Sequence, residues 1–81
     1  MYTKIQLGKD LKEQLLENKS AKYIGGWAYF IYTKHMLEID LSLRELLLAL
    51  GTMELRPEFE HTHEELSEIA NRLIAGEDVK L

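Results

Sequence analysis

The segment His61-Thr62-His63-Glu64-Glu65 is the one place in this chain where metal-binding side chain types follow one another closely. Imidazole and carboxylate groups both bind divalent cations. Histidines that converge on zinc from one helix are spaced four residues apart, whereas His61 and His63 are two apart and straddle a predicted helix start. A closed site would need further ligands, and the only other histidine is His35. We therefore expect no metal and no cofactor here, but a solvated helix start whose acids complement the helix dipole.

His35 is the remaining candidate for chemistry, because histidine exchanges protons near neutral pH and is the commonest general base. To activate a nucleophile it would need a serine, such as Ser20 or Ser42, and an acid that orients its ring. Both serines lie near predicted helix starts, and the chain has no cysteine, no glycine-rich phosphate loop and no nucleophile elbow. We expect a hydrogen-bonded histidine at the core boundary, and a protein that is not an enzyme.

The elements that would position these residues are predicted to be helices. Three times, a residue that favours a helix start is followed three positions later by glutamate, the spacing of a capping box. The pairs are Asp10 with Glu13, Ser42 with Glu45, and Thr62 with Glu65. Because apolar residues with helical spacing follow each pair, the sequence predicts an all-α fold, a compact bundle of three to four short helices in a single domain over residues 1–81.

The two N-terminal segments differ in how clearly they can be assigned. Tyr2 to Leu7 alternates loosely and predicts a short strand or extended arm, followed by a helix from Asp10 to about Asn18. Ser20 to Leu37 has helical spacing of its apolar residues, but Gly25-Gly26 also fits the turn of a hairpin. We favour the helix, in which these glycines would cost about 1 kcal/mol each but would allow another backbone to approach closely.

A leucine-rich helix is predicted from about residue 41 to 55, at the centre of the bundle. One stripe on it should face the core and consists of Leu43, Leu46, Leu47, Leu50 and Met53. A second stripe, Leu41, Leu48 and Leu55, recurs every seven residues on nearly the opposite side. A helix with two apolar faces is either enclosed in its own domain or shared with another chain, and the small number of helices favours an interface.

The last third of the chain is predicted to be a loop and one more helix. Pro57 ends the leucine-rich helix, and Phe59 is expected to anchor the loop on the core. Thr62 should cap a helix that ends at Gly76, with residues 77–81 as a tail. The apolar face of this helix is Leu66, Ile69, Ala70 and Leu73.

Aromatic residues are concentrated between residues 23 and 32. They are Tyr23, Trp27, Tyr29, Phe30 and Tyr32. On a helix they would spread around most of the circumference, so they cannot all face one core. Some must contact the N-terminal arm, a partner or a small ligand, and we assign Tyr29 and Phe30 to a predicted interface because aromatic residues are enriched in such surfaces.

The net charge of −4 is unevenly distributed. Residues 1–34 hold six lysines against three acids, a net +3, whereas residues 35–81 hold four basic residues against eleven acids, a net −7. This pattern argues against a general nucleic-acid binder, which needs a clustered basic face. Glu64 and Glu68 could dock a basic protein partner by charge complementarity, or they could only solvate the last helix.

Together these features predict a small soluble protein-interaction domain that is a homodimer and acts as an adaptor or regulator. The alternative is an acidic neutralising protein, an antitoxin or immunity protein that occludes a basic partner. A DNA regulator ranks third, because phosphates would repel Glu64, Glu65 and Glu68. No stretch approaches the roughly 20 apolar residues of a membrane span, so we expect a cytoplasmic location without membrane contact.

Overall fold

The protein is all-α, and the computed structural model describes every residue from Met1 to Leu81. Its elements are α1 (Lys4–Leu16), α2 (Ala21–His35), α3 (Leu41–Leu55), a short 3-10 helix η1 (Pro57–Phe59) and α4 (His63–Ile74). There is no strand, so the predicted fold class is confirmed. The segment that could have been a hairpin is a continuous helix through Gly25 and Gly26.

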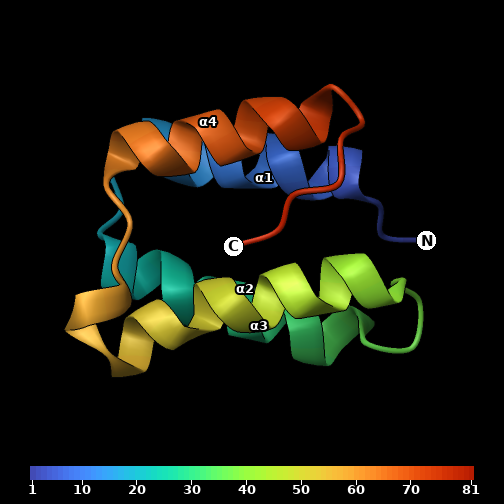
Figure 1. Cartoon of the computed structure of the whole chain (residues 1–81), viewed down its shortest axis with the longest axis horizontal. Coiled ribbons are helices and arrows are strands. Elements are labelled where there is room, and N and C mark those ends of the chain that lie inside the picture. Colours follow the sequence, from blue (N-terminus) through green and yellow to red (C-terminus); the bar gives the residue numbers. More distant parts are fainter.

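The four long helices form two antiparallel pairs that are stacked as two layers (Figure 1). The chain runs back and forth, so that α1 lies beside α4 in one layer and α2 beside α3 in the other. The core lies between the layers and contains only apolar side chains. The leucine-rich helix α3 buries its predicted stripe, but it pairs with α2 and is not the centre of the bundle.

Glycines allow the helices of each pair to approach at backbone distance. A Cβ atom added at Gly25 of α2 would lie 2.7 Å from the backbone nitrogen of Glu54 on α3. A Cβ atom added at Gly8 of α1 would lie 2.8 Å from the carbonyl oxygen of Ala70 on α4. Both positions are therefore too crowded for any side chain, which explains why the helix interior tolerates the cost of glycine there.

The predicted N-terminal arm is wrong, because α1 begins at Lys4 and not at Asp10. Thr3 is its N-cap, and the Thr3 hydroxyl accepts a hydrogen bond from the backbone N–H of Gln6 at 3.1 Å. Asp10 lies within the helix, and its carboxylate accepts hydrogen bonds from the hydroxyl of Tyr2 and the amide of Gln6, both at 2.8 Å. Residues 4–9 are helical since Leu7 and Leu11, one turn apart, are both fully buried.

Of the three predicted capping boxes, only Thr62 with Glu65 forms. Helix α3 is capped by Asp40 in place of Ser42, and the Asp40 carboxylate accepts a hydrogen bond from the backbone N–H of Leu43 at 2.8 Å. An ionised carboxylate is a stronger acceptor than a hydroxyl, so the earlier residue caps the helix. The sequence pattern locates helix starts to within a few residues and does not decide between adjacent candidates.

The segments that flank α4 also differ from the prediction. Phe59 is half exposed and does not anchor the loop in the core. Gly76 ends α4 with a φ of +88°, as predicted. The tail then returns between the two layers (Figure 1), where Val79 is buried and Asp78 forms an ion pair with Lys4 at 2.9 Å. The tail therefore packs between α3 and α4 and covers part of the core.

The two adjacent glycines of α2 should respond differently to substitution. Gly25→Ala should lower the free energy of unfolding by about 1–3 kcal/mol, because the new methyl group meets the α3 backbone. Gly26→Ala is the matched control: its Cβ would meet only the mobile end of the Glu54 side chain, and alanine favours a helix by up to about 1 kcal/mol. Urea unfolding followed by circular dichroism measures both. Equal losses in the two variants would contradict the close approach at Gly25.

Candidate functional site

Apolar side chains are exposed along the side of the α2–α3 pair that faces away from the core. We call this surface the outer apolar face, and it consists of Tyr29, Met36, Leu41, Leu48 and Leu55. The spacing of seven residues aligns the three leucines along α3. They are 66% (Leu41), 40% (Leu48) and 81% (Leu55) exposed. The predicted second stripe of α3 is thus exposed to solvent.

Contacts between the two helices place the α2 residues on this face. A Cβ atom added at Gly51 would lie 3.6 Å from the Cβ atom of Tyr29. Gly51 is one turn after Leu48 and one turn before Leu55, so the half-exposed Tyr29 ring lies beside these leucines. At the other end, the Arg44 guanidinium donates a hydrogen bond to the carbonyl oxygen of Met36 at 3.0 Å. The face therefore extends over both helices.

Phe30 is exposed as well, but it does not lie on the outer apolar face with Tyr29. Successive residues of a helix point about 100° apart, and Phe30 lines a groove on another side of α2 together with Tyr23 and Trp27. Trp27 and Tyr32 pack partly against the core. The aromatic cluster of the sequence is thus divided among the core, the outer apolar face and this groove.

Glu64 and Glu68 are exposed on α4, in the other layer, and neither forms an ion pair within the chain. Their neighbour Glu65 is engaged in the capping box. The hydrogen bond from the Thr62 backbone N–H holds the pKa of the Glu65 carboxyl below its usual value. A docking surface for a basic partner at Glu64 and Glu68 stays a prediction, separate from the outer apolar face.

The three histidines lie in different surroundings. His63 contacts the carbonyl oxygen of Lys19 through Nε2 at 2.7 Å, so its N–H joins the start of α4 to the linker between α1 and α2. His61 has Nδ1 4.0 Å from the Glu65 carboxylate. No group of three or more potential metal ligands comes together in the structure. Absence of a bound metal at His61 and His63 stays a prediction.

His35 is part of a polar cluster at one end of the molecule, which the sequence did not reveal. Its ring stacks on Tyr2 with a centroid distance of 4.5 Å, and Nδ1 lies 2.8 Å from the Glu38 carboxylate. The hydrogen bond with His35 lowers the pKa of Glu38. Burial is the main cause that raises the pKa of Tyr2. Because Tyr2 precedes α1 and His35 ends α2, the cluster joins the two layers.

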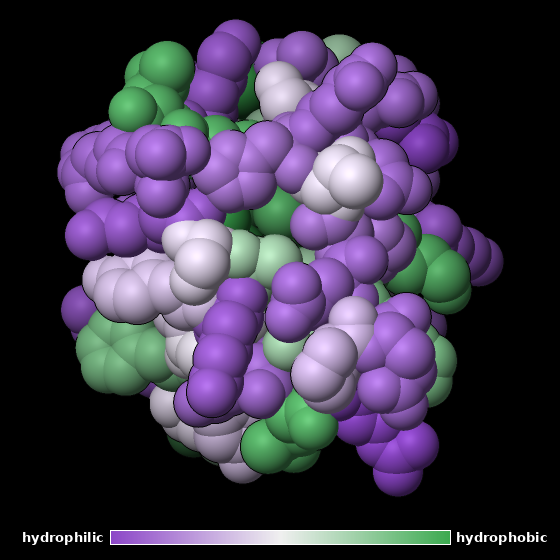
Figure 2. Space-filling view, turned by 90° about the vertical axis from the view of Figure 1, so that its left-hand side faces the viewer, coloured by the Kyte–Doolittle hydropathy of each residue, from purple (hydrophilic) through white to green (hydrophobic).

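The end of the molecule where α2 begins and α3 ends is largely hydrophilic (Figure 2). Hydrophobic groups appear on it as separate areas, including some along the lower edge, where the outer side of α2 and α3 lies.

No helix is both long and apolar enough to cross a membrane. Comparison with known proteins finds no matching family, no similar curated sequence and no similar solved structure.

The lowered pKa of Glu38 predicts a pH-dependent contribution to stability. The unfolded chain binds this proton more tightly than the folded one, so the contribution is present above the usual pKa near 4.5 and is lost as pH falls through the folded value. Between about pH 6 and about pH 3, Glu38→Gln should lose less unfolding free energy than the wild type. Glu45→Gln, which removes a glutamate with no hydrogen bond to its side chain, is the control. Identical pH profiles for wild type and Glu38→Gln would contradict the role of this contact.

Proposed function

We propose that this chain is a protein-interaction domain that forms a homodimer through the outer apolar face and acts as an adaptor or regulator without catalysis. The observation that carries the proposal is the exposure of Leu41, Leu48 and Leu55 in one line along α3, beside Tyr29 of α2. Burial of apolar surface contributes roughly 25 cal/mol per Å². A domain that leaves these side chains in water gains stability when a partner covers them.

The leucine line suits a second copy of the same chain, because it is symmetric about its centre. Leu41 and Leu55 are each seven residues from Leu48. When two α3 helices pack antiparallel about a two-fold axis at Leu48, each Leu41 faces the Leu55 of the other copy. One residue pattern then supplies both halves of the interface.

The size of the face supports an interface as well. Helices α2 and α3 have 15 residues each, which corresponds to a length of roughly 22 Å. A standard interface covers about 800 Å² of each partner, or about one sixth of the 5089 Å² surface of this chain. The area of the outer side of the α2–α3 layer is of the same order. The second copy would add a further layer, and the two α2–α3 pairs would form a four-helix bundle across the two-fold axis.

The surroundings of the titratable groups support an interaction role over catalysis. His35 is bound to Glu38 and stacked on Tyr2, and His63 is bound to the linker before α2. Each of these side chains connects segments that are distant along the chain. The residues of the outer apolar face, in contrast, keep 40% to 81% of their surface exposed, and a partner that covered them would remove this apolar surface from water.

Substitution at the centre of the face tests the homodimer. Light scattering at high micromolar concentration should give the wild type twice the chain mass of 9.5 kDa. Leu48→Glu should give the mass of a single chain, because each interface would bury two unpaired charges at a cost of several kcal/mol. Leu16→Glu is the control, since Leu16 lies on α1, outside the face, and is 81% exposed against 40% for Leu48. A monomeric wild type, or a Leu48→Glu variant that remains dimeric, would contradict the proposal.

A further inference from the structure

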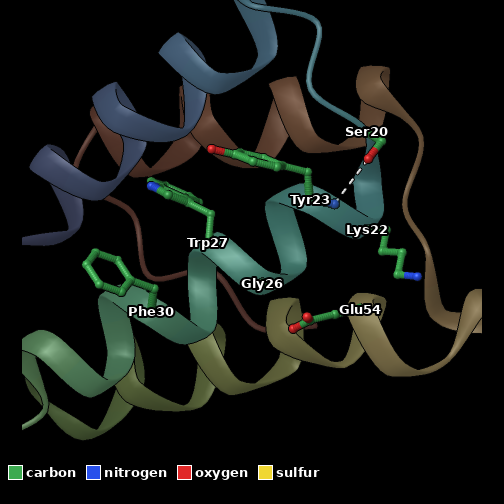
Figure 3. A pocket seen from close by; sticks show the side chains of 7 residues that line it. All are labelled: Ser20, Lys22, Tyr23, Gly26, Trp27, Phe30 and Glu54. Carbon is green, nitrogen blue, oxygen red and sulfur yellow. Dashed lines mark hydrogen bonds between the residues drawn. The ribbon is translucent and has the colours of Figure 1, made fainter.

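A groove with an aromatic wall follows α2 on a side that the outer apolar face does not cover (Figure 3). It has a volume of about 720 Å³. The side chains of Tyr23, Trp27 and Phe30 project in a row from one side of the helix, and the backbone of Gly26 lies beside this row, on the side of Glu54. Tyr23, Gly26, Trp27 and Phe30 have the spacing i, i+3, i+4 and i+7. That set forms the diamond-shaped hole into which a helix of another chain inserts one side chain.

The packing of the fold does not explain why Gly26 is a glycine. Gly25 and Gly8 face a neighbouring backbone at less than 3 Å, but a Cβ atom at Gly26 would meet only the carboxylate end of Glu54, at 3.2 Å or more. A glycine in a helix interior disfavours the helix and needs another reason. A glycine here leaves this edge of the groove covered only by the flexible end of the Glu54 side chain, which must move aside for an approaching group to reach the α2 backbone.

The charges around this groove are mainly positive. The Lys19 ammonium lies over the Tyr23 ring at 4.8 Å from its centroid, and the Lys34 ammonium lies over the Phe30 ring at 5.8 Å. Lys22 lines the groove itself, and the one carboxylate that lines it is that of Glu54. Neither Lys22 nor Lys34 forms an ion pair within the chain, whereas the Lys19 ammonium lies 3.9 Å from the Glu17 carboxylate. The groove thus combines an apolar hole with a rim that attracts negative charge.

We propose that this groove binds an acidic amphipathic helix of a partner protein. An apolar side chain of that helix enters the hole above Gly26, and acidic residues one turn to either side pair with Lys19, Lys22 and Lys34. None of the residues that line this groove belongs to the outer apolar face, so the proposal is tested independently of the homodimer. The acidic helix α4 of a second copy cannot be the occupant, because its apolar side chains Leu66, Ile69 and Leu73 are buried in its own core.

Single-stranded nucleic acid, which also combines stacking with negative charge, fits the groove less well. Bases stack on open ring faces, whereas lysines of the chain itself already lie over the Tyr23 and Phe30 rings. The chain as a whole carries a net charge of −4, which opposes a polyanion at longer range. An acidic helix needs only a few local ion pairs and one apolar contact.

Selection from a helical peptide library tests this proposal on the full-length protein. Displayed peptides of about five turns carry fixed leucines on one stripe, and glutamate, lysine or glutamine in equal proportion at the flanking positions. We expect selection to enrich glutamate over lysine at those positions. A selected peptide should bind at least tenfold more weakly to Gly26→Leu, which fills the hole, and to Lys22→Glu with Lys34→Glu, which reverses the rim.

Matched variants separate this effect from a loss of fold. Lys9→Glu with Lys80→Glu changes the net charge equally, away from the groove, and should bind the peptide like the wild type. Gly26→Leu should melt no lower than the wild type and should keep the same mass in light scattering. Should Gly26→Leu fail to fold, the Lys22→Glu, Lys34→Glu variant decides alone.

Four results would overturn the proposal: no peptide binds above the display background, lysine is enriched in place of glutamate, the rim variant binds like the wild type, or a folded Gly26→Leu does so. Binding of a single-stranded thymidine oligonucleotide that is lost in the rim variant would assign the groove to nucleic acid instead. Because the outer apolar face is unchanged in all of these variants, failure here leaves the mass of the homodimer, and the function proposed from it, unaffected.

Discussion

Close contact between helix backbones within each pair determines the rest of this structure. At Gly25 and Gly8 the neighbouring helix approaches so closely that no Cβ atom fits. Little space then remains for large side chains between paired helices, and the larger apolar residues lie either between the two layers or on the outside. Leu47 and Leu50 of α3 face inward and are fully buried, whereas Leu48, one position from Leu47, is on the outside. The same close pairing that builds the core therefore also produces the outer apolar face.

The two exposed surfaces of α2 differ in chemistry, and this difference follows from their position on the helix. Tyr29 faces α3 at Gly51 and joins a surface with aliphatic neighbours, which suits a symmetric contact with another copy. Phe30 points away from α3, next to Lys34, and belongs to a groove with a positive rim. If both proposed contacts form, the domain would hold a second copy and a different partner at once, as an adaptor does.

Local patterns in the sequence predicted much of the fold, and long-range contacts explain what they missed. The bounds of α3 follow from its leucine spacing and from Pro57, and the Thr62 cap follows from Glu65. The helical start at Lys4 was missed because Leu7 and Leu11 are buried against elements distant in sequence. Gly25 and Gly26 look equivalent in the sequence, yet only Gly25 meets a backbone. Helix periodicity alone could have predicted that Tyr29 and Phe30 lie on different sides of α2. The stacking of Tyr2 on His35 joins residues 33 positions apart, so no local sequence pattern indicates it.

Disulfide cross-linking at the proposed two-fold axis tests the central claim most directly. The chain has no cysteine, so Leu48→Cys introduces a single thiol at the centre of the outer apolar face. Disulfide formation requires Cα atoms within about 7 Å of one another, a distance that an antiparallel pair of α3 helices would satisfy at the axis. We predict that mild oxidation converts Leu48→Cys to a covalent dimer much faster than Leu16→Cys, which places its thiol on α1. Equal rates for the two variants, or no cross-link at Leu48→Cys, would contradict it.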